Sequence, residues 1–506
     1  MPLKHFILAH DLGTTGNKAT LFDVDGSMVA STLATYPTAY PQPNWAEQDP
    51  ADWQAAVFGS TRRLLAESNI NPDQIAVVSF SGHMQGALAV DAQGIPLRPA
   101  IIWADQRATA QADFIARRWG YDEVYRLTGN RVSPAYTVAK ILWLKENQPD
   151  LYRRTHKILQ PKDYAAFLLT GVFATDYSDA SLAQLLDLGQ RHYAAEFLER
   201  LGISFALLPD LHPSAAVIGQ VTPQAAEATG LRAGTPVVIG GGDGACATVG
   251  AGSIQPGDVY NYLGSSSWVG LSTDRPVLDP QQRTFNFCHL DPNLYCAIGT
   301  MQTAGGAFDW FERLLRAETQ NEPDYRSLDA AAQAVPPGAN GLLFLPYLLG
   351  ERSPHWNPHA RAAFVGLAMP NGRAELSRAV LEGVAFNLRH ILDILRGQGV
   401  AVEAMRLIGG GGNSALWRQI LADVYNLPIL RVSLSAEATA LGAAIAGGVG
   451  VGLYPDYGVA KALIPVTAAE QPNPASRARY EALYELFKAS YVALEPIYEQ
   501  LANLPG

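Results

Sequence analysis

The stretch Thr235–Gly252, TPVVIGGGDGACATVGAG, decides how the rest of the chain is interpreted. A short apolar run, Pro236–Ile239, meets three glycines, and a single carboxylate, Asp243, follows at once. Glycine has no side chain, so another molecule can approach the backbone closely there. An Asp at the carboxyl end of a buried strand lies where α/β folds place their ligands. The stretch predicts a general base at Asp243, with the N-cap of a small-residue helix as the simpler alternative.

Length and composition favour a globular protein of two or three domains. The chain has 506 residues, of which 48% are hydrophobic and 17% charged. A net charge of -10 without a long basic run argues against a nucleic acid partner. Backbone amides can nevertheless bind a small anion such as phosphate.

The chain carries no sign of export or of a membrane anchor. The first apolar run meets Asp11 too soon for a signal sequence, and no apolar stretch approaches membrane-spanning length. Cys246, Cys288 and Cys296 form no CxxC pair, and their odd number does not indicate a disulfide framework. We therefore expect a cytoplasmic protein with reduced thiols and no membrane partner.

A strand–loop–strand pattern opens the chain. Phe6–Ala9 and Ala19–Phe22 are apolar, and the loop between them contains DLGTTGNK. The loop can bind a phosphate through its backbone amides, the hydroxyls of Thr14 and Thr15 and the cation of Lys18. The spacing of a Walker A motif is absent. The alternative is a polar hairpin tip with a surface lysine.

A similar layout recurs about half a chain later. NYLGSSSWVGLSTD, residues 261–274, and HDLGTTGNKATLFD, residues 10–23, both read as strand, glycine, hydroxyl-rich loop, strand and turn. Such a repeat predicts a duplicated architecture in which two similar domains each present a phosphate loop. A nucleotide held between the domains would meet both loops. Two unrelated hairpins are the alternative.

Two strand ends supply candidates for a polar pocket. Ile75–Phe80 leads into SGHMQG, which places His83, Met84 and Gln85 at a bend. A second apolar run leads into WADQR, which begins at Trp103 and offers an indole, a carboxylate and a guanidinium. Aromatic stacking combined with hydrogen bonding suits small polyols. The alternatives are a satisfied histidine, a core methionine and an ion pair at a helix start.

Other segments repeat the combination of strand, glycines and helix. Met405–Val424 contains four glycines before a helical pattern, and Gly299–Leu315 is a glycine-rich turn feeding a helix. A helix start without side chains can take a flat ring or a phosphate. Ala436–Gly448 predicts a helix able to pack close to another backbone. Residues 108–235 read as largely helical, and helices are predicted at 52–67, 136–151, 161–171, 375–395 and 472–501.

Competing enzyme classes lack their motifs. Gly242, Gly244 and Ala247 spell a dinucleotide fingerprint, but Gly252 ends the helix early and Asp258 precedes the next strand. The chain contains neither the G-x-S-x-G of serine hydrolases nor the HExxH of metal hydrolases. Phosphoryl transfer needs the parts that are present, because its catalysis is mostly positioning and charge neutralisation.

Taken in order, these motifs resemble the FGGY family of carbohydrate kinases, within the actin and hexokinase superfamily. DLGTTGNK and LGSSS are similar to its two phosphate motifs, GGGDG to its catalytic motif and IGGGGNSALWRQILAD to its adenosine motif. AAFVGLAMPNGRAELSRAVLE resembles its C-terminal signature. The resemblance covers nearly the whole chain. It implies an α/β fold with two actin-like ATPase (ribonuclease H-like) domains around a central cleft, residues 1–252 carrying the sugar and 253–506 the adenosine.

The resemblance also implies roles for individual residues. Asp243 would be the general base, Asp11 would hold Mg²⁺, and ATP would be the phosphoryl donor. Met84, Gln85, Trp103 and Asp243 would bind the sugar. The nucleotide would contact Gly13, Thr14, Thr15, Lys18, Gly264, Ser265, Gly305, Gly410 and Gly411. A homodimer is one assembly that we expect.

Within the family, NWAEQDPADW, PLRPAIIWADQR and PKDYAAFLLTG are most similar to xylulokinases, which implies phosphorylation of D-xylulose to D-xylulose 5-phosphate. Two departures from the xylulokinase pattern leave a gluconokinase or another pentulose or polyol kinase of the family as the alternative. His83 and Gln85 are exchanged relative to the usual G-Q-M-H-G, and Gly244 stands where Asn usually follows the catalytic Asp. A catalytically silent sugar-binding regulator is the alternative from another class, and the intact Asp11 and Asp243 argue against it.

Overall fold

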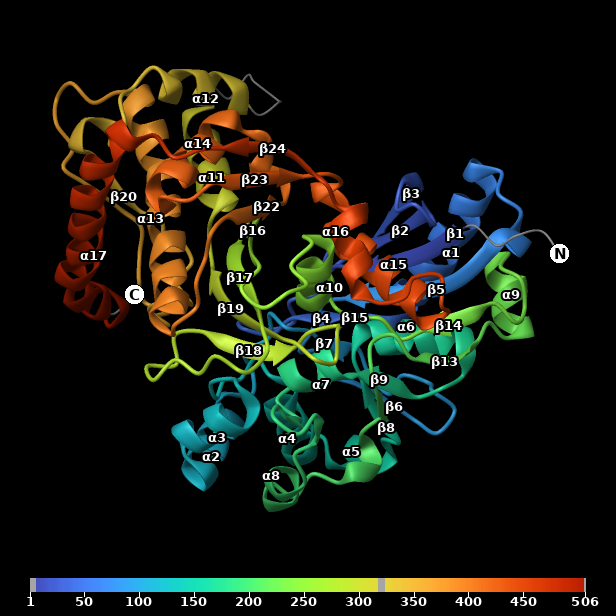
Figure 1. The fold of residues 1–506 in the computed structure, drawn as a ribbon. Coiled ribbons are helices and arrows are strands. Elements are labelled where there is room, and N and C mark those ends of the chain that lie inside the picture. The colour runs from blue at the N-terminus through green and yellow to red at the C-terminus, as the bar shows by residue number, and fades with distance from the viewer. Residues whose placement is uncertain (1–5, 317–323, 505–506) are drawn as a thin grey trace.

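The computed structural model describes residues 6–316 and 324–504, which form two large sheets with helices packed around them (Figure 1). The first sheet has the strand order β13-β14-β5-β1-β2-β3, and β15 also pairs with β5. Its strands are β1 (Phe6–Leu12), β2 (Gly16–Asp23), β3 (Met28–Thr35), β5 (Ile75–Gly82), β13 (Val217–Gln220), β14 (Pro236–Val238) and β15 (Gly241–Gly242).

The second sheet belongs to the other half of the chain and has the order β18-β19-β17-β16-β22-β23-β24. Its strands are β16 (Val259–Leu263), β17 (Ser267–Thr273), β18 (Phe285–Cys288), β19 (Tyr295–Met301), β22 (Met405–Ile408), β23 (Ile429–Val432) and β24 (Val466–Glu470).

The two sheets share one topology. In the first, β1 pairs antiparallel with β2 and parallel with β5, and in the second β16 pairs antiparallel with β17 and parallel with β22. A further parallel strand, β14 or β23, follows in each sheet, and an antiparallel strand, β13 or β24, comes after it. This equivalence confirms the duplicated architecture and the predicted actin-like α/β fold.

The main predicted helices are confirmed, with ends set by local signals. For example, α6 begins with a capping box between Gln160 and Asp163 and ends at Gly171, whose φ of 74° is left-handed. A proline after Gln148 separates α4 from α5. The helices in question are α1 (Pro50–Ser68), α4 (Thr137–Asn147), α5 (Pro149–Arg154), α6 (Pro161–Thr170), α11 (Gly305–Leu315), α13 (Arg373–Gly397), α14 (Ala415–Tyr425) and α17 (Pro474–Ala502).

Residues 108–235 are less helical than the sequence predicts. Short strands alternate there with α2 (Thr109–Trp119), α3 (Tyr121–Thr128), α7 (Tyr177–Leu182), α8 (Ala195–Arg200) and α9 (Pro223–Thr229). The strands are only two to four residues long, so they carry no readable alternation of side chains. Besides β13, they are β8 (Lys157–Leu159), β9 (Ala174–Asp176), β10 (Leu186–Asp187), β11 (His192–Tyr193) and β12 (Asp210–His212).

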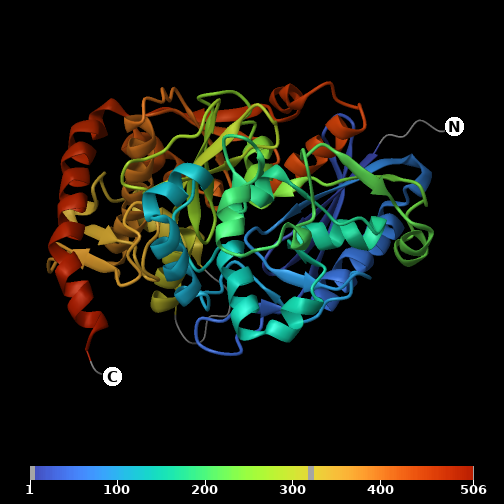
Figure 2. The same cartoon turned by 90° about the horizontal axis from the view of Figure 1, so that it is seen from below.

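Two small-residue helices join the sheets. α10 (Asp243–Gly250) leads from the first sheet to the second, and α15 (Ala438–Gly450) returns to pack on α10, β1 and β5 (Figures 1 and 2). A Cβ added at Gly250 would lie 1.7 Å from the Ala438 carbonyl oxygen, and one at Gly442 would lie 1.9 Å from that of Cys246. The expected close approach of this helix to another backbone is therefore confirmed.

The described residues agree with the composition in two further respects. All three cysteines are buried and free. Among the helices of residues 6–316 and 324–504, none combines the length and apolar character needed to cross a membrane.

Candidate active site

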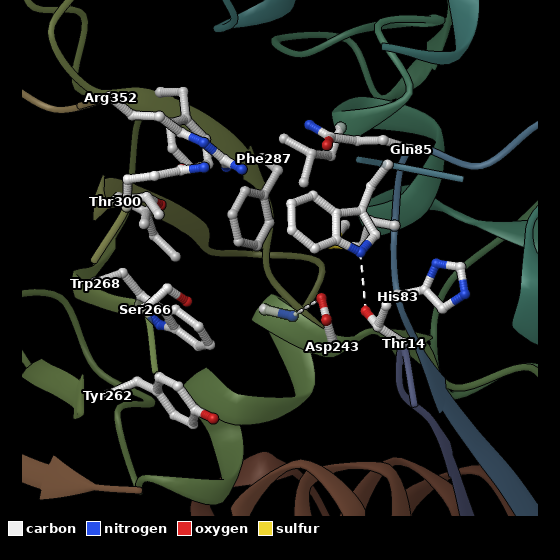
Figure 3. Close-up of a pocket in the computed structure, with 17 residues that line it drawn as sticks. Thr14, His83, Gln85, Asp243, Tyr262, Ser266, Trp268, Phe287, Thr300 and Arg352 are labelled. Atoms are coloured by element: carbon white, nitrogen blue, oxygen red, sulfur yellow. Dashed lines mark hydrogen bonds between the residues drawn. The ribbon is translucent and has the colours of Figure 1, made fainter. Parts of the chain in front are cut away.

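Asp243 is the first residue of α10, directly after β15. Gly242 is the N-cap, with extended backbone angles, so Asp243 is not the N-cap that the simpler interpretation predicts. One carboxylate oxygen, Oδ1, accepts a hydrogen bond from the Gly244 backbone N–H at 2.7 Å. The side chain lines a cavity of about 330 Å³ whose walls come from both halves of the chain (Figure 3).

Two neighbouring carboxylates set the electrostatics of this cavity. Burial and, to a lesser extent, the negative charge of Asp11 raise the pKa of Asp243 to about 7, against the opposing effect of the hydrogen bond from Gly244. Burial also raises the pKa of Asp11, and the nearby hydroxyls of Thr439 and Ser81 and the charge of Lys18 oppose the shift. A carboxyl with a pKa near neutral can accept and release a proton at physiological pH, as a general base must.

The same pair of carboxylates suits a divalent cation. Mg²⁺ is usually bound by one or two carboxylates together with substrate phosphates and water. Within residues 6–316 and 324–504, no group of three His, Cys, Asp or Glu side chains gathers into a complete metal site. Asp11, whose charge acts on Asp243, fits a cation that brings phosphate and water as its other ligands.

The four predicted sugar residues all line the cavity: Met84, Gln85, Trp103 and Asp243. Met84 packs so closely on the backbone before Asp243 that a Cβ at Gly242 would lie 2.4 Å from its Cε. Gln85 has a φ of 66°, in the left-handed region that non-glycine residues seldom adopt. Such strain persists only where surrounding contacts hold it in place.

Lys140 supplies those contacts, and the sequence interpretation missed it. The side chain is fully buried, and its Nζ donates to the backbone carbonyls of Gln85, Ile102 and Ala135 at 2.7, 2.8 and 2.6 Å. Burial lowers the pKa of Lys140 to about 7. The Lys140 ammonium thus holds three backbone segments in place: the one at Gln85, the one before Trp103 and the one that leads into α4. A lysine within the apolar run of α4 is a sequence signal for a buried cation, but it does not specify the three carbonyls that it binds.

Thr14 and His83 both line this cavity, and the nucleotide contact of Thr14 stays a prediction. Trp103 Nε1 donates to Thr14 Oγ1 at 2.9 Å, so Thr14, predicted for the nucleotide, lines the same cavity as the sugar residues. His83 is buried, and neither ring nitrogen has a hydrogen-bond partner among the described residues. The satisfied-histidine alternative is therefore wrong. Burial lowers the pKa of His83 to about 3, which keeps the ring neutral.

The second half of the chain contributes a wall of the cavity that the sequence did not predict. Tyr262 and Trp268 stack with ring centroids 4.0 Å apart, and Arg352 reaches in from the loop after β20 (Leu343–Leu345) (Figure 3). The residues of this wall are Tyr262, Ser266, Trp268, Phe285, Phe287, Ile298, Thr300, Gln302 and Arg352.

Phe287 accounts for the glycine after Asp243. A Cβ at Gly244 would lie 3.0 Å from the Phe287 ring carbon Cζ. The aromatic ring fills the space that an asparagine side chain would need at this position. An apolar wall thus lies beside Asp243, where an asparagine would add a polar side chain.

Three predicted nucleotide turns converge beyond the end of β16. The Gly305 N–H donates to the Gly264 carbonyl at 2.8 Å, and the Gly306 N–H donates to that of Ser265 at 3.0 Å. A Cβ at Gly411 would lie 2.5 Å from the Leu263 Cγ atom, immediately before Gly264. The space beside Gly410 is open. Turns far apart in the sequence thus form one backbone surface, on which the nucleotide contacts stay a prediction.

The first phosphate loop is linked to the second half of the chain. Lys18 forms an ion pair with Glu437 at 3.2 Å, just before α15, so the predicted phosphate-binding cation has a protein partner. The Gly13 carbonyl accepts a hydrogen bond from the Tyr36 hydroxyl at 2.6 Å, and Thr15 is exposed. The loop is therefore anchored at Gly13 while Thr15 stays accessible.

Comparison with known proteins identifies the family. Models of the N-terminal and C-terminal domains of FGGY carbohydrate kinases match residues 6–250 and 259–451. The chain belongs to the FGGY family of carbohydrate kinases. This FGGY kinase is 32% identical to the xylulose kinase of Bacillus subtilis (strain 168), over 96% of each chain. It is 31% identical to the gluconokinase of Bacillus licheniformis, over 98% of each chain.

A solved structure agrees with this assignment. The FGGY kinase superimposes on the ligand-bound xylulose kinase from Lactobacillus acidophilus with a TM-score of 0.91 and 29% identity, over 98% of this chain and 99% of that one. The chain is thus a phosphotransferase with an alcohol group as acceptor. Sugar kinases of this family use ATP as the donor.

Proposed function

We propose that this FGGY kinase transfers the γ-phosphoryl group of ATP to O5 of D-xylulose, with Asp243 as general base. The observation that carries the proposal is a carboxylate with a pKa of about 7 in a cavity built by both halves of the chain. Similarity to xylulose kinases over nearly the full length supports the choice of sugar.

In the proposed reaction, Asp243 accepts the proton of the attacking hydroxyl and orients its oxygen toward the phosphorus. A hydroxyl is a weak nucleophile, and a positioned base contributes about 10² to 10⁴-fold. Gln85 and Trp103 hold the sugar from the first half, and their own positions depend on Lys140. The cavity walls exclude water, which limits hydrolysis of ATP.

The nucleotide would lie across both phosphate loops, with Gly264, Ser265 and Gly305 on its phosphates and Gly410 and Gly411 against the adenosine. Backbone N–H groups at such turns bind phosphate without a side-chain charge. The sugar-carrying part would then be residues 1–252 and the adenosine-carrying part 253–506, with α15 packed back on the first sheet.

Asp11 would hold Mg²⁺ beside these phosphates. When bound, the cation supplies charge neutralisation for the transferring group. The repulsion between Asp11 and Asp243 is the observation that supports this placement, since a cation between carboxylate and phosphate relieves it.

Gluconate is the second candidate acceptor, and the cavity gives a specific reason. Phe287 occupies the space beside Gly244, so the wall next to the base differs from the xylulokinase pattern. Gln85, rather than a histidine, has the strained conformation at the cavity. Both positions contact the region in which the acceptor would be bound.

Coupled ADP release across D-xylulose, L-xylulose, D-ribulose, gluconate and glycerol tests the proposal. We expect the highest kcat/KM with D-xylulose, and Asp243→Asn should lose at least two orders of magnitude while still binding ATP. Turnover of gluconate alone would favour the second candidate. Absence of sugar-dependent ADP release with every acceptor would instead support a silent sugar-binding regulator.

A further inference from the structure

Arg352 is the one cation of the cavity wall, among the described residues, to which neither the motifs nor the proposed mechanism gives a role. It lines the cavity that contains Asp243 and also an adjoining hollow of about 540 Å³. Five residues separate the two spaces and belong to both walls: Gln85, Trp103, Phe285, Gln302 and Arg352.

The charge of Arg352 has no acidic or hydrogen-bonding partner among the described residues, and the guanidinium instead faces an aromatic ring. Its guanidinium forms no ion pair and no hydrogen bond with any residue in 6–316 or 324–504, and it lies 5.5 Å from the centre of the Trp103 ring. By contrast, the buried Arg107 pairs with both Asp105 and Glu47 at 2.7 Å. An unpaired guanidinium in a partly buried wall is costly unless a ligand completes it.

The neighbouring acid does not neutralise this charge. The Glu351 carboxyl accepts hydrogen bonds from the backbone N–H groups of Gln302 and Arg352 at 2.6 and 2.8 Å, and from Asn387 Nδ2 at 3.1 Å. Burial raises the pKa of Glu351 to about 8, so this carboxyl is mostly protonated at neutral pH. The guanidinium therefore gives this side of the cavity a net positive charge.

The cavity consequently has a positive and a negative side. In Figure 3, Arg352 points inward from the side of Thr300, and Asp243 lies on the other side of Phe287. We propose that Arg352 binds the end of the acceptor remote from the reacting hydroxyl, and that this end carries a carbonyl oxygen with a second oxygen beside it. This inference rests on the proposed sugar kinase function and deepens it.

The chemistry of guanidinium explains this choice of ligand. Its planar fork donates two parallel N–H bonds to a pair of adjacent oxygens. A 2-ketose offers such a pair in its C2 carbonyl and C1 hydroxyl, and an aldonate offers one in its carboxylate. In both, the pair lies at the opposite end of the carbon chain from the terminal hydroxyl. A simple polyol has no carbonyl oxygen to place there.

The test compares Arg352→Met, which removes the charge, and Arg352→Lys, which keeps the charge but not the fork, with the wild type. Arg361→Met is the matched control, because Arg361 is exposed on the same loop and donates only to the backbone carbonyls of Pro358 and Ala360. D-xylulose and gluconate are the two carbonyl-bearing acceptors, and xylitol is the neutral acceptor without a carbonyl.

We expect Arg352→Met to raise KM for the carbonyl-bearing acceptor about 10- to 100-fold, since a hydrogen bond to a charged group is lost. Arg352→Lys should recover part of this loss, while KM for ATP and binding of xylitol should change less than about threefold. Sugar binding measured by tryptophan fluorescence in an Asp243→Asn background provides the same comparison without turnover.

The outcomes separate this inference from the proposed substrate. If the wild type turns over gluconate and not D-xylulose, the proposed substrate is wrong, and a selective loss for gluconate in Arg352→Met still supports the role of Arg352. An unchanged acceptor KM in Arg352→Met, an equal loss for xylitol, or a wild type that prefers xylitol would each overturn the inference.

Discussion

The pKa of Asp243 gives a quantitative prediction for the pH dependence of the reaction. With a pKa of about 7, the carboxyl is ionised in about one-tenth of the molecules at pH 6 and about nine-tenths at pH 8. Only the ionised form can accept the proton of the sugar. We therefore expect kcat/KM for the sugar to rise about tenfold from pH 6 to pH 8 when ATP is kept well below its KM, so that enzyme without bound MgATP sets the profile.

The assay is initial-rate ADP release at constant ionic strength, with Asp243→Asn measured alongside. The variant should retain a small residual rate with no inflection near pH 7. A wild-type profile that is flat between pH 6 and pH 8 would refute the assignment of Asp243 as the titrating base. So would a variant with the same inflection as the wild type.

The same shift has an effect on stability, of opposite sign. The native pKa is raised above the ordinary value of 3.8, so between about pH 4 and 7 the native state binds more protons than the unfolded state. The contribution of Asp243 to the free energy of unfolding therefore falls as pH rises through that window. Asp243→Asn is neutral at every pH, so its advantage in Tm over the wild type should grow from pH 4 to pH 7 and then level off.

Two further substitutions test the surroundings of the cavity. Gly305→Ala places a Cβ 2.5 Å from the backbone oxygen of Gly264, so KM for ATP should rise at least about tenfold. The control is Gly59→Ala on α1, where a Cβ meets nothing within 4 Å and KM for ATP should stay unchanged. Equal KM values for ATP in these two variants would contradict the role of the turn. Lys140→Met removes the donor shared by three carbonyls, so KM for the sugar should rise about tenfold or more while KM for ATP stays constant. A parallel rise in both constants would indicate a general loss of structure instead.

Features that depend on local pattern could be predicted from the sequence. The strand before Gly240, the glycine turns and the long helices are encoded by short-range periodicity and by capping residues. The repeat of the two hairpins was readable for the same reason, and the matching pairing of β1–β2 and β16–β17 confirms it.

Features that depend on tertiary pairing could not be predicted from the sequence. Tyr262 and Trp268 face the cavity together because they are direct partners in the β16–β17 register, which their spacing alone does not specify. Lys140 acts on three backbone carbonyls, and no side-chain motif encodes such acceptors. Arg352 lies in a loop, where no periodicity indicates the direction of a side chain.

The crossing of α10 and α15 limits how the two halves of the chain can be exchanged between relatives. At the crossing, Gly250 meets the carbonyl of Ala438, and Gly442 meets that of Cys246, so each helix depends on the absence of a side chain in the other half. A chimera that joins the first half of this chain to the second half of a relative would therefore need both helices from one parent. A single breakpoint anywhere between Asp243 and Gly450 would separate this matched pair of surfaces, whereas a breakpoint before α10 or after α15 would leave it intact.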